Sequence, residues 1–136
     1  MRTPSVAAGI NIDQVRQFCL ALPHATEQVQ WGSDLVFKIG GKMFAVVPLE
    51  PAANSLSFKA SPEEFAELVE RPGFVPAPYL ARAQWVALER GVALPRRELE
   101  RLLRQAYELV LAKLPQKTRR EQAEKPAKAA RLKARG

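Results

Sequence analysis

The sequence is poor in the residue types on which most active sites depend. It contains 1 cysteine and 1 histidine in 136 residues. A single cysteine excludes an intramolecular disulfide, and Cys19 with His24 cannot supply the four ligands of a structural zinc site. No segment approaches the roughly 18 consecutive apolar residues of a membrane span, so we expect no membrane partner. Residues 1–10 hold one arginine and no apolar block of secretory-signal length, which predicts a cytoplasmic protein.

Recognisable catalytic motifs are missing as well. Residues 40–43, Gly-Gly-Lys-Met, lack the upstream glycine and the hydroxyl residue of a phosphate-binding loop, and no G-x-G-x-x-G or G-x-S-x-G occurs. His24, the one base with an ordinary pKa near neutrality, directly follows Pro23 in a predicted turn. The glutamates of residues 63–70 lie on one predicted helix, a pattern typical of a solvated surface. We therefore expect no cofactor, no metal and no enzymatic activity.

Positive charge is present, but it is concentrated at one end. The chain carries 21 Lys and Arg and 14 Asp and Glu, a formal net charge of +7. Residues 1–114 hold 13 basic and 12 acidic side chains, whereas residues 115–136 hold 8 basic and 2 acidic ones. The hydrophobic content of 47% is enough for one packed core of this length. The sequence therefore predicts a flexible lead-in over residues 1–10, one domain over 11–114 and a basic tail over 115–136.

The first periodic segment is a helix. Apolar residues from Ile12 to Leu22 recur at helical spacing, Asn11 is a suitable N-cap with Gln14 three residues on, and Pro23 ends the segment. Cys19 falls within the apolar arc, which favours a buried small hydrophobe over a reactive thiol.

A hairpin with a Gly40-Gly41 turn follows over residues 35–47. An uninterrupted register pairs Phe37 with Phe44 and Leu35 with Val46, and so predicts one face that includes all four of these residues and Ile39. The opposite face collects Val36, Lys38, Met43, Ala45 and Val47. This second face is too apolar to be fully solvated, so we expect a helix, a partner or a ligand to cover part of it.

The remaining elements complete an α+β pattern. A strand over 56–60 leads into a helix with Ser61 as N-cap, Pro62 at its first position and an end at residues 71–73. Residues 74–78 contain two prolines and predict an edge strand or rigid loop. A strand over 84–88 and a helix over 95–114 follow. The order α-β3-α-β2-α predicts a single α+β domain, an antiparallel sheet flanked by helices.

The body offers a modest set of candidate contacts for nucleic acid. Lys38 and Lys59 occupy outward strand positions, Lys42 lies at the hairpin tip, and Arg82 is close in sequence to Tyr79. The two tryptophans, Trp31 and Trp85, are expected at core or edge positions. Asp34 follows the Trp31-Gly32-Ser33 turn, where a turn-capping role is favoured over a ligand role. A small-molecule or enzymatic site near Trp31, Asp34, Lys59 and Tyr79 is a further alternative.

The tail supplies the stronger electrostatic signal. Its basic residues are Lys117, Arg119, Arg120, Lys125, Lys128, Arg131, Lys133 and Arg135. The tail has no aromatic residue, and Leu132 is its only large aliphatic residue. It is therefore predicted to be disordered when free. Its cations suit phosphate contacts, and residues 127–135 have the composition to become helical on a polyanion. A purely solubilising role is the competing interpretation.

The combined pattern resembles the MmcQ/YjbR family of small bacterial proteins. The matching segments are Asn11 to Cys19, Leu22-Pro23, Ala25 to Glu27, Trp31-Gly32, the Lys38 to Phe44 hairpin, Leu56 to Lys59, Pro62-Glu63, Pro76 to Leu80, Trp85-Val86 and Tyr107 to Pro115. The resemblance implies an α-β3-α-β2-α fold and a DNA-binding label attached to a "double wing" arrangement of strands. Two positions depart from the family pattern: His24 stands where Gly is frequent, and Ala106 where Ser is frequent.

Together these features suggest a small non-enzymatic DNA-binding or DNA-associated protein whose basic tail contacts phosphates. The alternative is a protein-interaction module or homodimer that uses the apolar sheet face and the proline-rich edge. DNA, a second copy and another protein are the partners that the sequence leaves open.

Overall fold

The computed structural model describes residues 9–78 and 80–124. In chain order the elements are α1 (Ile12–Ala21), β1 (Thr26–Gln30), β2 (Asp34–Ile39), β3 (Lys42–Pro48), β4 (Asn54–Lys59), α2 (Pro62–Leu68), β5 (Phe74–Pro76), the 3₁₀ turn η2 (Ala81–Ala83), β6 (Trp85–Glu89), α3 (Arg96–Lys113) and α4 (Gln116–Glu124). The α+β class predicted from the sequence is confirmed.

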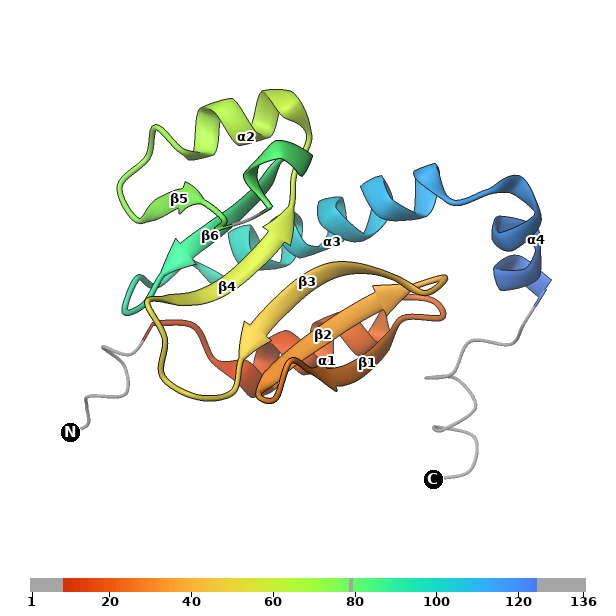
Figure 1. The fold of residues 1–136 in the computed structure, drawn as a ribbon, viewed down its shortest axis with the longest axis horizontal. Coiled ribbons are helices and arrows are strands. Elements are labelled where there is room, and N and C mark those ends of the chain that lie inside the picture. The colour runs from red at the N-terminus through yellow and green to blue at the C-terminus, as the bar shows by residue number, and fades with distance from the viewer. Residues whose placement is uncertain (1–8, 79, 125–136) are drawn as a thin grey trace.

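The strands form one antiparallel six-stranded sheet in the order β1-β2-β3-β4-β6-β5. Figure 1 shows α1 and α3 behind this sheet, and α3 contacts β2, β3, β4 and α1. We call the helix-covered side the inner face and the opposite side the outer face. The inner face therefore carries the main core, because both α1 and α3 bury their apolar stripes against it.

Local signals in the sequence account for the helix ends. The Asn11 side chain accepts a hydrogen bond from the backbone N–H of Gln14, and the Ser61 hydroxyl accepts one from that of Glu64. Both satisfy amides that the first helical turn leaves without partners. Cys19 is fully buried in the inner core, as predicted, and burial raises the pKa of its thiol.

One strand was not predicted. Residues 26–30 form β1, which pairs with β2 in an uninterrupted antiparallel register at the edge of the sheet. Its sequence, Thr-Glu-Gln-Val-Gln, has one aliphatic residue and shows no apolar alternation. An exposed edge strand buries little of either side, so tertiary pairing rather than hydrophobic patterning defines it.

The predicted hairpin register is correct at its tip and wrong beyond it. Ile39 pairs with Lys42 as expected, but a bulge between Phe37 and Lys38 shifts the rest by one residue, so that Phe37 lies opposite Ala45. Because side chains alternate along a strand, the shift sends three β3 residues to the faces opposite those predicted. Ala45 and Val47 join the inner core and Val46 joins the outer face.

The outer face has its own smaller apolar cluster. Val36 and Val46 of the hairpin and two β6 residues pack there against the segment that follows β5. Ala77 of this segment is buried and Leu80 is partly buried in the cluster. A loop of the same chain, and not a helix, therefore covers part of the apolar face that the sequence predicted to need a cover.

A hydrogen bond across the core fixes the turn between α1 and β1. Tyr107 of α3 is buried, and its hydroxyl donates to the carbonyl oxygen of Pro23 at 2.8 Å. His24 occupies a left-handed conformation with φ 62°, which glycine adopts with less strain. The glycine that the family resemblance implies at this position would therefore be less strained than His24.

The beginning of the predicted tail is ordered against the hairpin tip. Residues 116–124 form the helix α4, in contrast to the disorder expected for them, and residues 125–136 lie outside the described residues. The contact is close: a Cβ added to Gly40 would lie 2.5 Å from Cδ1 of Leu114 and 3.3 Å from Cγ2 of Thr118. The packing of this segment on Gly40 supplies a contact that the tail composition alone does not show.

The two glycines of the turn allow a matched test of this packing. Gly40→Ala introduces both a left-handed alanine, at φ 60°, and a clash with Leu114, whereas Gly41→Ala introduces a left-handed alanine at φ 81° into open space. We expect Gly41→Ala to lower the free energy of unfolding by about 1–2 kcal/mol and Gly40→Ala by about 2–4 kcal/mol, measured by urea denaturation. Equal losses would show that Leu114 does not press on the turn.

Candidate nucleic-acid interface

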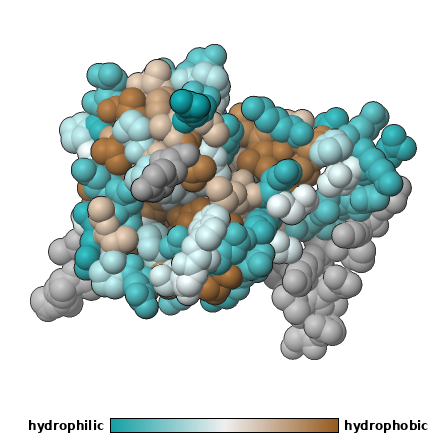
Figure 2. Space-filling model, in the orientation of Figure 1, coloured by the Kyte–Doolittle hydropathy of each residue, from teal (hydrophilic) through white to brown (hydrophobic). Residues whose placement is uncertain are grey.

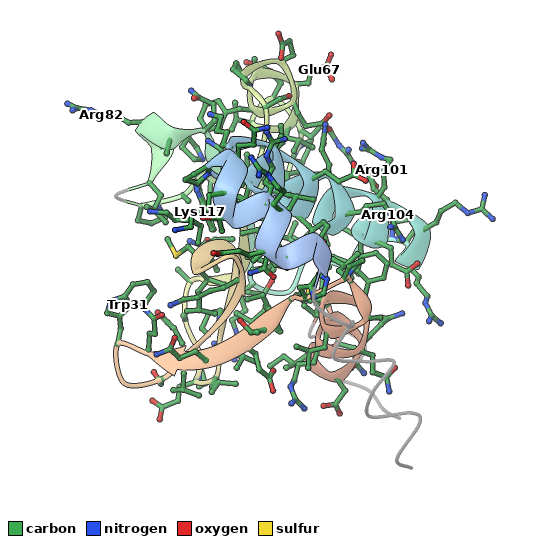
Figure 3. All side chains as sticks on the ribbon, turned by 90° about the vertical axis from the view of Figure 1, so that its right-hand side faces the viewer. Trp31, Glu67, Arg82, Arg101, Arg104 and Lys117 are labelled. Carbon is green, nitrogen blue, oxygen red and sulfur yellow. The ribbon has the colours of Figure 1, made fainter. Side chains whose placement is uncertain are left out.

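The outer face of the sheet is bordered by two exposed side chains of different chemistry. Trp31 projects from the β1–β2 turn and Arg82 from η2, and Figure 3 shows both on the same side of the molecule, with Arg101 and Arg104 of α3 on the opposite side. Trp31 and Arg82 are both exposed, Trp31 by 65%. The outer face thus lies between an aromatic side chain and a cation.

Two lysines lie on the outer side of the strands between these borders. Lys38 of β2 donates from Nζ to Oε1 of Gln28 on β1 at 2.9 Å, and Lys59 of β4 donates from Nζ to the carbonyl oxygen of Ala83 at the end of η2. The pKa of Lys59 is lowered, mainly because burial removes water from its ammonium group and secondly because Lys113 repels it. Lys113, at the end of α3, is therefore within electrostatic reach of Lys59.

Further cations gather where the hairpin tip, the end of α3 and α4 meet (Figure 1). Lys42 is exposed beside the Gly40-Gly41 turn, and Lys117 is exposed on α4 next to Thr118, which approaches Gly40. In Figure 3, Lys117 lies on the side of the molecule that carries Trp31 and Arg82. Arg119 and Arg120 of α4 are exposed as well.

The ion pairs of the described residues lie elsewhere. They join Arg16 to Glu27, Arg71 to Glu98, Arg96 to Glu100 and Arg101 to Glu64. Within residues 9–78 and 80–122, no carboxylate lies within 4.0 Å of the ammonium groups of Lys38, Lys42, Lys59 or Lys113 or of the Arg82 guanidinium. The cations of the outer face and its adjoining end are therefore available to an external anion.

A hollow of about 410 Å³ opens on the outer face beside Trp31. Its lining residues are Trp31, Asp34, Met43, Val46, Ser57, Ala77, Pro78 and Leu80. Its volume lies within the usual range of small-molecule sites. Figure 2 shows apolar side chains at the surface on this face, bordered by polar ones.

Trp31 holds an unusual backbone conformation at the rim of the hollow. Its φ of 52° is left-handed, which costs a bulky residue roughly 1–2 kcal/mol, and the indole gains little burial in return. The next residue of the turn between β1 and β2, Gly32, also has a positive φ, of 89°. Exposure of a strained tryptophan is more typical of a contact surface than of a folding requirement.

The structure brings together most of the body residues selected from the sequence. Lys38, Lys59 and Arg82 lie along the outer face, with Lys42 and Lys117 at the adjoining end, while Trp85 is buried beneath the face. Trp31 and Asp34 line one hollow, but Lys59 is not among its lining residues. The remaining predicted contacts lie outside the described residues: Tyr79, Lys125, Lys128, Arg131, Lys133 and Arg135.

Two contributors were missed from the sequence. Lys113 was not considered, although a lysine in the final turn of the last predicted helix, just before the basic tail, was a usable signal. Gln30 was not considered because β1 was not predicted. Its Oε1 atom is the one buried side-chain acceptor without a hydrogen-bond partner among the described residues.

Two further features of the described chain bear on function. Within residues 9–78 and 80–124, no group of three His, Cys, Asp or Glu side chains is arranged to hold a metal ion. None of the helices in the same ranges combines the length and apolarity needed to cross a membrane.

Comparison with known proteins places the chain in a family. The family model named YjbR matches residues 20–109, which include all six strands of the sheet and the larger part of α3. The chain therefore belongs to the YjbR family, as its sequence pattern indicated. No curated protein matches the sequence significantly.

Solved structures agree with this assignment. The crystal structure of the Deinococcus radiodurans protein DR2400, described with a DUF419 domain, is similar with a TM-score of 0.74 and 29% identity, covering 86% of this chain and 90% of that one. A Pseudomonas syringae protein is similar with a TM-score of 0.58 and 19% identity over 74% of this chain and 98% of its own, which shows a common fold. Neither description states a ligand or an activity.

The coupling between Lys59 and Lys113 is directly measurable. We expect Lys113→Gln to raise the pKa of Lys59, because the repulsion disappears, but not to its ordinary value, because desolvation is the larger cause of the shift. NMR titration of the Lys59 side chain measures the change. Arg97→Gln, which removes an exposed charge at the opposite end of α3, should leave the titration unchanged and serves as the control. An unchanged Lys59 titration in Lys113→Gln would show that Lys113 does not affect the pKa of Lys59.

Proposed function

We propose that the protein binds nucleic acid through the outer face of its sheet and the adjoining α4 end, as a binding protein and not as an enzyme. The observation that supports the proposal best is the convergence of unpaired cations. Lys38, Lys59 and Arg82 line the face, Lys42 and Lys117 continue it, and the ion pairs among the described residues involve other cations. The family's DNA-binding label, implied by the resemblance, agrees with this proposal.

Phosphate is the ligand group that this arrangement favours. Phosphates release condensed counterions when Lys and Arg neutralise them, so a row of free cations supplies affinity even on a body with little net charge. The closeness of Lys59 to Lys113 adds to this effect, because an anion beside both would relieve their mutual repulsion.

The basic segment after α4 extends the same charged region. Arg119 and Arg120 are exposed on α4, and the cations from residue 125 onward follow directly in sequence. We propose that the body orients the nucleic acid and that the tail adds sequence-independent phosphate contacts.

The contribution of the outer face is tested with two variants of equal charge change. Lys59→Gln with Arg82→Gln removes two cations from the proposed face, whereas Arg90→Gln with Arg97→Gln removes two exposed cations from the end of the molecule remote from α4. Binding of a labelled 20-base single strand and its duplex is measured by fluorescence anisotropy at several salt concentrations. The first variant is expected to reduce the slope of log K against log salt by about 1.4–1.8, and the control pair to leave it near the parent value.

The same assay distinguishes the contribution of the tail to binding from that of the body. A full-length variant with glutamine at the five basic positions from Lys125 to Arg135 is expected to bind more weakly but to depend still on Lys59 and Arg82. If the two charge-matched pairs weaken binding equally, the outer face has no special role. If the parent chain binds neither strand nor duplex at low salt, the proposed function is wrong.

Exposed apolar residues support a second candidate, self-association or a protein partner. Val29 and Leu49 are exposed by 54% and 44%, and Val29 belongs to the edge strand β1, which has no proline or lysine to block strand pairing. In Figure 2 another apolar surface lies over the C-terminal half of α3. Sedimentation velocity over a range of concentrations tests self-association, and a monomer throughout would contradict the homodimer.

A further inference from the structure

We infer that the hollow beside Trp31 receives one unpaired nucleobase that carries an exocyclic amino group, with cytosine as the reference case. The inference rests on the proposed function and specifies its ligand: single-stranded nucleic acid, read at one base. It depends on Trp31, on the Asp34 carboxylate and on the position of the lysines, and each is argued in turn.

Trp31 supplies a stacking surface. Trp31 is 65% exposed at the rim of the hollow, so burial of the indole does not offset the conformational cost of its left-handed backbone. Aromatic side chains bind unpaired bases by stacking, because every base has a flat π-face. A base within a duplex is already stacked and paired, so it reaches such a side chain only after leaving the stack.

The acceptor in the hollow selects the edge of the base. Asp34 lines the hollow, and Gln30 lies directly opposite it in the β1–β2 pairing, so the two side chains share the outer face, although Gln30 itself is not among the lining residues. Within the described part of the chain, no group donates a hydrogen bond to the Asp34 carboxylate. A carboxylate only accepts hydrogen bonds, and the amino group of cytosine, adenine or guanine provides a donor for it.

The charge of Asp34 argues against phosphate at this place. A carboxylate repels phosphate, although the rest of the outer face is lined by cations. The contrast assigns different parts of a nucleotide to different parts of the face: the base to the hollow at Asp34, and the backbone to the cations. Lys38 pairs with Met43, which lines the other end of the hollow, so a backbone phosphate beside the bound base lies within the cationic region.

The walls of the hollow suit a flat, mostly apolar ligand. Val46 and Ser57 are paired neighbours on β3 and β4 and line it from the sheet, while Pro78 and Leu80 line it from the loop after β5. The volume of about 410 Å³ lies near the lower end of the range for small-molecule sites. It therefore suits one base with its sugar and not a stretch of duplex.

The inference is tested with two oligonucleotides of equal charge. The full chain is titrated with dC12, dT12 and a 12-base-pair duplex at one low salt concentration. Cytosine offers an amino group where thymine has a carbonyl oxygen, so we expect dC12 to bind about tenfold more tightly than dT12 and the duplex to show no quenching of Trp31. Because Trp85 is buried and would add a constant signal, the fluorescence is read in a Trp85→Phe background.

Two substitutions separate the base contact from the phosphate contacts. Trp31→Ala is expected to weaken dC12 binding about tenfold, while the salt slope stays unchanged; this affinity is measured by the anisotropy of labelled dC12, because the variant has no indole in the Trp85→Phe background. Asp34→Asn is expected to reduce the preference for dC12 over dT12, since its amide can also donate to the carbonyl of thymine. Leu49→Ala, at an exposed apolar residue outside the hollow, is the control and should bind as the parent does. Circular dichroism and urea unfolding confirm that each variant is folded.

The outcomes distinguish this inference from the proposed function. Equal binding of dC12 and dT12, with Trp31→Ala indistinguishable from the parent, overturns the base site but leaves a protein that binds phosphates. Absence of binding to all three oligonucleotides overturns both. Stronger binding and stronger quenching by dT12 would also contradict the assignment, because it would show that the Asp34 carboxylate does not select the base.

Discussion

The packing of α3 across the inner face of the sheet is the contact on which the rest of the structure depends. Leu99, Leu102, Leu103 and Ala106 are buried there, and the helix is long enough to extend past the sheet at its end. Tyr107 fixes the turn after α1 from the same helix, and Leu114 reaches the hairpin tip. One helix therefore sets the position of α1, of the β2–β3 turn and of α4.

Because α1 and α3 pack on the inner face, the outer face is covered differently. Among the described residues, the segment after β5 crosses it and closes part of the apolar cluster while leaving a hollow beside Trp31. The charges follow a similar division within the part of the chain that the structure describes, since Arg16, Arg71, Arg96 and Arg101 form ion pairs and the outer lysines do not. The result is a face with available cations, an exposed aromatic side chain and a carboxylate in a hollow, which is the basis of both functional proposals.

The bulge in the hairpin shows where prediction from sequence meets its limit. The glycines of residues 40–41 correctly indicated the turn, and Ile39 and Lys42 pair as expected, but one extra residue in β3 reverses the faces of Ala45, Val46 and Val47. All three are small or apolar, so either register buries apolar surface, and the pattern alone does not choose between them. For β1 the difficulty was the opposite one: a polar edge strand leaves no periodic signal, and its pairing with β2 defines it.

The amino-acid sequence alone determined the elements whose signals are local. These are the capped helices α1 and α2, the glycine turn, the proline-restricted edge and the concentration of charge near the C-terminus, because capping, turn geometry and composition act between near neighbours. Tertiary structure decided which distant groups meet. Residues far apart in the chain come together only through the packing of α3 and the order of the strands. Lys113 comes within electrostatic reach of Lys59, Asp34 lines one hollow with Pro78 and Leu80, and Leu114 packs on Gly40.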